Sequence, residues 1–165
     1  MAVRSCLATA VAVEPFAGAL EPEEQPTQQW IIGRLHPLSY LLARPQPTRG
    51  GFVFPADEYF YARCEARRLQ EAVDLVLTHL GVPRAAVGHV AFDPNLEVGG
   101  RVNHARTATY LQFSPHHEES PQEVGALIAH ACAHVLAHRA RLPAMGGWED
   151  EVNTDLIAVL GGLGL

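Results

Sequence analysis

The chain contains no lysine, and its twelve arginines are outnumbered by eighteen acidic residues among 165. The arginines are scattered along the sequence, and the formal net charge is −6. A domain that binds nucleic acid usually shows clustered basic residues and a positive charge. The sequence therefore argues against nucleic acid as a partner.

Cysteines and long apolar runs are also scarce. The three cysteines are far apart and form no C-x-x-C pair: Cys6, Cys64 and Cys132. The sequence therefore predicts neither a disulfide framework nor a thiolate zinc site. No apolar run approaches the roughly 20 residues that a membrane-spanning helix needs. We therefore expect a cytoplasmic protein that does not associate with membranes.

The first twenty residues combine Arg4, a short apolar stretch and small residues at 17–19, as a signal peptide does. Glu14 and Pro15 interrupt the apolar stretch, and its continuous part is short for a signal peptide. We predict a buried strand here, with a signal peptide as the less favoured alternative.

The length and an apolar content of 48% suit one folded core. Segments 21–29 and 44–51 are polar and contain proline or glycine, so they predict loops around the apolar segment 30–42. Pro37 should interrupt that segment, giving two short helices or a strand and a turn. We divide the chain into an N-terminal segment, 1–51, packed on a domain that spans 52–165.

Residues 57–80 predict an amphipathic helix that packs on the core. Apolar residues recur there at helical spacing: Leu69, Val73, Val76 and Leu80. Gly81 and Pro83 follow, as is typical after the end of a helix.

Segments 89–92 and 107–113 are rich in β-branched and aromatic residues and predict strands. Residues 93–103 predict a glycine-containing loop between them. We expect the two strands to pair antiparallel.

A second helix begins with a clear capping pattern, in which Ser120 precedes Pro121 and Glu123 follows three residues after the serine. We interpret Glu123 as a capping carboxylate. His130 and His134 lie one turn apart on this helix, with Cβ atoms about 5–6 Å apart, so their imidazoles can converge on one metal ion.

Two histidines need a third ligand to form a stable zinc site. One class of metalloproteases takes it from a histidine soon after the second ligand, but the matching residue is Ala140. Glu151 and Asp155 begin the next apolar helical run at the spacing of one turn. Glu151 can reach the metal, while Asp155 can accept the free N–H of a ligating histidine.

These motifs, H-x-x-x-H at 130–134 and E-x-x-x-D at 151–155, resemble those of the gluzincin branch of zinc metallopeptidases, and of small bacterial zincin-like proteins in particular. The resemblance, from about Phe52 onward, implies an α+β fold with a small antiparallel sheet packed on an amphipathic helix and a metal-binding helix pair. It implies zinc held by both histidines and Glu151, supported by Asp155. The family's general-base glutamate is replaced by Ala131.

Two more histidines are candidates for a role at the site. His138 extends the series on the helix but lies near its C-terminal end beside Arg139, where favourable interaction with the helix dipole is the simpler interpretation. His104 precedes the second predicted strand in a loop and is able to polarise a carbonyl, although a solvated histidine is more usual there.

The missing base decides the functional hypothesis, because a positioned general base contributes about 10²–10⁴-fold to a rate and alanine cannot act as one. Glu123 lies two turns before His130, roughly 10 Å away along the axis, which is too far for it to replace the missing base. No catalytic residue is assigned. We expect a catalytically impaired metallopeptidase homologue that serves as a binding or regulatory module for an unknown protein or peptide. The alternatives are a metal-dependent hydrolase with a different base, another metal enzyme such as a non-haem iron protein, or a metal-free structural domain.

Overall fold

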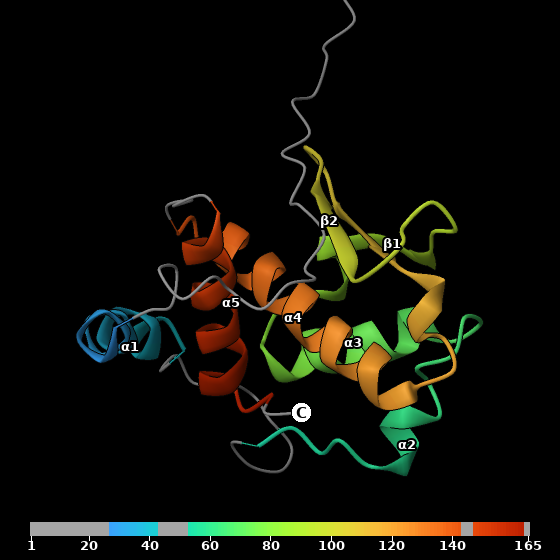
Figure 1. Ribbon diagram of the computed structural model, residues 1–165, viewed down its shortest axis with the longest axis horizontal. Coiled ribbons are helices and arrows are strands. Elements are labelled where there is room, and N and C mark those ends of the chain that lie inside the picture. The colour runs from blue at the N-terminus through green and yellow to red at the C-terminus, as the bar shows by residue number, and fades with distance from the viewer. Residues whose placement is uncertain (1–26, 43–52, 143–146, 164–165) are drawn as a thin grey trace, which may run out of the picture.

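The computed structural model describes residues 27–42, 53–142 and 147–163. This part of the chain has an α+β fold of five α-helices and one three-stranded sheet (Figure 1). The α+β class predicted from the sequence is therefore confirmed. The strand predicted within residues 1–20 lies outside the described residues.

The elements follow one another along the chain with two 3₁₀ turns between them. The helices are α1 (Gln28–Leu42), α2 (Glu58–Tyr61), α3 (Leu69–His79), α4 (Pro121–Arg139) and α5 (Trp148–Leu160). The strands are β1 (Val87–Phe92), β2 (Gly100–His104) and β3 (Thr109–Phe113), and the 3₁₀ turns are Arg84–Ala86 and Pro115–His117. Helix α4 packs against α3, α5, β2 and β3, so it is the element that joins the parts of the fold (Figure 1).

The sheet corrects the predicted strand pairing. Its order is β1-β3-β2, with β1 parallel to β3 and β2 antiparallel to β3. Strand β2 takes up the end of the predicted loop 93–103 together with His104, and Val102 is its one aliphatic residue. Because β2 forms the hairpin with β3, the strands predicted to be antiparallel partners run in the same direction.

Pro37 does not interrupt α1, which contradicts the predicted break in segment 30–42. A proline inside a helix removes one backbone N–H donor and crowds the carbonyl four residues earlier. Helix α1 packs against α5, with the rings of Trp30 and Trp148 5.5 Å apart, and this packing favours the continuous helix.

The helix predicted over 57–80 is two helices, because α2 ends at Tyr61 and α3 begins at Leu69. Asp57 caps α2 by accepting from the N–H of Phe60 at 3.0 Å. The regular apolar spacing covers only α3, which explains why a single helix does not extend through residues 62–68. The predicted amphipathic helix on the core is therefore α3 alone.

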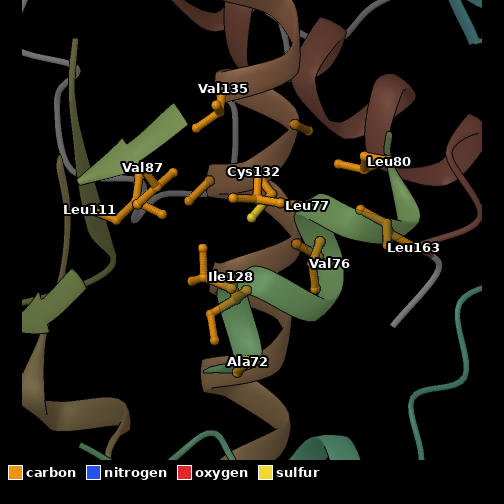
Figure 2. Close-up of a cluster of buried hydrophobic side chains, with 14 of the residues drawn as sticks. Ala72, Val76, Leu77, Leu80, Val87, Leu111, Ile128, Cys132, Val135 and Leu163 are labelled. Carbon is orange, nitrogen blue, oxygen red and sulfur yellow. The ribbon is translucent and has the colours of Figure 1, made fainter. Parts of the chain in front are cut away.

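The core lies between α3, α4 and the sheet (Figure 2). Ile128, Cys132 and Val135 project from α4 toward α3 and the strands, and all three side chains are fully buried. Cys132 is a free thiol whose pKa is raised by burial, so it serves as a small apolar side chain of the core. Burial of one face of α4 fixes the direction in which its other face points.

Within residues 27–42, 53–142 and 147–163, no helix combines the length and apolar character needed to cross a membrane.

Candidate metal site

Helix α4 begins as the capping pattern predicts. The Ser120 hydroxyl accepts from the N–H of Glu123 at 3.4 Å, and Pro121 occupies the first turn. The carboxylate of Glu123, however, does not act as the predicted cap of the helix. The Ser120 N–H donates to the carbonyl of His117 instead, while Glu123 accepts from the His117 ring, with Oε2 and Nδ1 2.6 Å apart.

Three side chains converge between α4 and α5: His130, His134 and Glu151. The Nε2 atoms of the two histidines are 3.1 Å apart. The Glu151 Oε2 atom lies 3.0 Å from Nε2 of His130 and 3.6 Å from Nε2 of His134. Of the residues that the structure describes, this is the one group of three or more His, Cys, Asp or Glu side chains with metal-ligand spacing.

These distances fit a tetrahedral zinc ion. Nitrogen and oxygen ligands bind zinc at about 2.0–2.2 Å, so two ligand atoms at tetrahedral corners lie about 3.3–3.6 Å from each other. The three observed separations lie close to these edge lengths. His130, His134 and Glu151 would thus supply three ligands to a bound zinc ion, and a fourth position would be open to water or another ligand, as in catalytic zinc sites.

Each histidine is held by a hydrogen bond at its other ring nitrogen. His130 Nδ1 lies 2.8 Å from Oδ1 of Asp155, which can only accept, so Nδ1 carries the proton. The Thr154 hydroxyl donates to the carbonyl of Asp150 at 2.8 Å and lies 3.3 Å from Nδ1 of His134, from which it accepts. Both imidazoles therefore direct Nε2 at the common point, which is how ligating histidines are usually oriented.

Asp155 lies at the margin of the site. Its side chain is 53% exposed, whereas those of His130, His134 and Glu151 are 11–19% exposed. Its contact is with the outer nitrogen of His130. The supporting role of Asp155 at a metal stays a prediction.

The same arrangement of side chains also suits a bound proton. Burial disfavours the charged imidazolium of His130, but hydrogen bonds to Asp155 and Glu151 outweigh that effect and raise its pKa to about 9. Burial likewise disfavours charge on Glu151, yet His130 and His134 hold the pKa of this carboxyl at about 2. A proton on Nε2 of His130 thus faces two acceptors at the point where a cation would sit.

A pocket of about 350 Å³ opens beside the three ligand atoms. It lies between α4, α5 and the start of β2, and its lining includes Ala131. Position 131 directly follows the first histidine, and its side chain faces the pocket. Ala131 therefore contributes a methyl group to the pocket wall at the position directly after the first histidine.

His104 and His138 do not join the ligand cluster. His104 is the last residue of β2 rather than a loop residue, and its ring stacks on that of His138 with centroids 3.8 Å apart and an interplanar angle of 6°. Burial, aided by His138 and His134, lowers the pKa of His104 to about 4. The stacked rings tie the end of β2 to the last turns of α4.

Two residues near the site have roles that the sequence did not indicate. Thr154 orients His134, and His117 pairs with Glu123 at the far end of the pocket. Thr154 is three residues after Glu151 and so shares its helical face, which is a signal that can be read from sequence. The contact of His117 depends on the turn before α4 and has no such signal.

Neither the protein-family models, nor the curated proteins, nor the solved structures include a match to this chain. The chemistry of the site is therefore argued from its own geometry.

Proposed function

We propose that this chain is a zinc-binding protein of zincin-like design, in which His130, His134 and Glu151 hold the metal and peptidase activity is lost. It serves as a binding or regulatory module. The observation that carries the proposal is the convergence of three ligand atoms from two helices at separations of 3.0–3.6 Å, close to the edges of a zinc tetrahedron.

The ligand set favours zinc. Two imidazole nitrogens and one carboxylate oxygen with one open position are a common arrangement for this ion. When bound, zinc supplies a Lewis acid that polarises whatever occupies the open position. The chain's own contribution is orientation, because Asp155 and Thr154 fix the tautomers of the two histidines.

Peptide hydrolysis also needs a group that takes a proton from water and passes it to the leaving amine. Ala131 has no such group. Asp155 is bonded to His130 on the outer side of the ring, and Glu151 is a ligand. Glu123 is seven residues before His130 in α4, which places it roughly 10 Å along the helix axis. None of these three carboxylates is therefore placed to act as the general base at the open position of the metal.

The test is a cleavage assay with short unstructured peptides and zinc-loaded protein, with zinc content measured on the same sample. We expect about one zinc per chain and no cleavage above background. Robust cleavage by the wild type that disappears in His134→Ala would contradict the loss of peptidase activity and show that another residue supplies the base.

A further inference from the structure

The pocket beside the proposed metal has apolar walls. Val102 and Phe113 contribute to it from the sheet, and Leu127 and Ala131 contribute from α4. Val102 and Phe113 are also part of the packed core, at 4% and 1% exposure, so this wall is preformed. A volume of about 350 Å³ lies at the lower end of the range for sites that bind small molecules. The pocket fits a small apolar molecule.

With zinc bound, the two ends of the pocket would differ in charge. The ligand atoms of the metal site lie at one end, and Glu123 lies about two helical turns away at the other. His117 accepts from the N–H of Gly99 through Nε2 at 3.2 Å, so its Nδ1 carries the proton that it donates to Glu123. The histidine is therefore neutral in this arrangement, and the negative charge of Glu123 is retained.

An anion in the pocket has few partners. None of the described residues that line the pocket is an arginine, and the chain has no lysine. The metal is then the cationic centre available to a ligand, while Glu123 disfavours a second negative group at the far end. A carboxylate is a suitable ligand for zinc, whereas an alcohol or an ammonium group binds it poorly without losing a proton.

We propose that the pocket binds a small monocarboxylic acid with an apolar body, its carboxylate on the metal and its hydrocarbon part along α4 toward Glu123. This inference rests on the proposed metal site. With Ala131 beside the open position, the acid is held and not transformed. The ligand is retained by two features, the metal at its head and the apolar walls around its body.

Three probes with the same body and different heads test the assignment: 4-phenylbutanoate, 4-phenylbutylamine and 4-phenylbutan-1-ol. Calorimetric titration into zinc-loaded protein should show the acid binding at least about tenfold more tightly than the amine or the alcohol. Removal of zinc should abolish the preference for the acid. Equal binding of all three probes, or undiminished binding of the acid to metal-free protein, would overturn the proposal.

A matched pair of leucine variants tests the wall. Leu127 and Leu136 are both partly buried residues of α4, but only Leu127 is among the residues that line the pocket. Leu127→Asn should weaken binding of 4-phenylbutanoate by about tenfold, as expected for the loss of one apolar contact surface. Leu136→Asn should leave that affinity unchanged. Equal losses in the two variants would contradict binding along this wall.

A third comparison tests the far end with octanoate and its dicarboxylate counterpart, octanedioate. The wild type should bind octanoate more tightly, and Glu123→Gln should narrow the difference because it removes the negative charge. Equal affinity of the two acids for the wild type would refute the role of Glu123. Tighter binding of an acetylated peptide ending in a free phenylalanine carboxylate than of 4-phenylbutanoate would replace the small acid with a peptide terminus.

Zinc content is measured on every sample, so the two proposals fail in different ways. Protein that takes up no zinc refutes the metal site itself. If zinc-loaded protein does not bind 4-phenylbutanoate, only the assignment of the ligand is refuted.

Discussion

The Thr154 hydroxyl accepts a hydrogen bond from Nδ1 of His134, with the two atoms 3.3 Å apart, while it donates to the carbonyl of Asp150 at 2.8 Å. Because the hydroxyl proton is engaged by the backbone, the threonine can only accept from the imidazole. His134 is thereby fixed with its proton on Nδ1 and its lone pair on Nε2. One buried side chain of α5 thus determines which nitrogen of an α4 histidine faces the proposed metal position.

Thr154→Val should weaken zinc binding by about 10–100-fold, the usual cost of removing a group that orients a ligating histidine. Valine has nearly the same shape as threonine, so packing at this buried position is largely retained. Thr154→Ser keeps the hydroxyl and should retain most of the affinity. Competition with a chromophoric chelator measures all three proteins, and equal affinities for the valine and serine variants would contradict this role.

Asp155 should affect the metal in the same indirect way. Asp155→Asn is expected to lower zinc affinity by about 10–100-fold, because it weakens the bond that orients His130. Glu151→Gln removes a ligand and should cost more. The chelator assay should therefore rank the wild type above Asp155→Asn, and Asp155→Asn above Glu151→Gln. The reverse order of the two variants would mean that the roles of the two carboxylates are exchanged.

The pH dependence of stability should differ between the metal-free and metal-loaded proteins. In the metal-free protein the pKa of His130 is raised from 6.5 to about 9, so its pairing stabilises the fold fully below pH 6.5 and is lost as the pH rises through 9. The pKa of Glu151 is lowered from 4.5 to about 2, so its contribution is present above pH 4.5 and is lost as the pH falls through 2. Both contributions are complete between pH 4.5 and 6.5.

Zinc must displace the proton from His130, so its apparent affinity should rise with pH by about tenfold per unit between pH 6 and 8 from this group alone. Titrations with buffered zinc at several pH values measure the slope. Asp155→Asn is the matched control, because loss of the carboxylate lowers the pKa of His130 and should reduce the slope. An affinity independent of pH in the wild type would show that no proton is displaced.

Ala131 offers a test by gain of function. Ala131→Glu should place a carboxylate at the pocket beside the open position of the metal. We expect unchanged zinc content and an increase in hydrolysis of short unstructured peptides of up to about 10²–10⁴-fold. Ala131→Gln has the same size without the base and should remain inactive. Equal hydrolysis by the glutamate and glutamine variants would contradict the view that only the base is missing.

The proximity of the central residues of the site could be predicted because helical spacing is a local property. His130 and His134 are one turn apart on α4, and Glu151 and Asp155 are one turn apart on α5, so each pair shares a face before any tertiary contact forms. The apolar residues on the other face of α4 then determine which side is buried. It could therefore be predicted that the four residues converge, but the distances between them could not be predicted.

Features set by tertiary contacts could not be predicted in the same way. Strand β2 contains one aliphatic residue, Val102, and is recognisable only through its pairing with β3. The stacking of His104 on His138 depends on where β2 ends relative to α4. The helix propensity of proline alone predicts a break at Pro37. Helix α1 nevertheless continues through it, because packing against α5 favours a continuous helix.

Zinc content of purified protein tests the central claim most directly. Elemental analysis after incubation with zinc and desalting should find about one zinc per chain in the wild type and little in His130→Ala or Glu151→Ala. His89→Ala changes an exposed histidine of β1 away from the ligand cluster and should keep the full content. Equal zinc in all four proteins, or none in the wild type, would contradict a metal site at His130, His134 and Glu151.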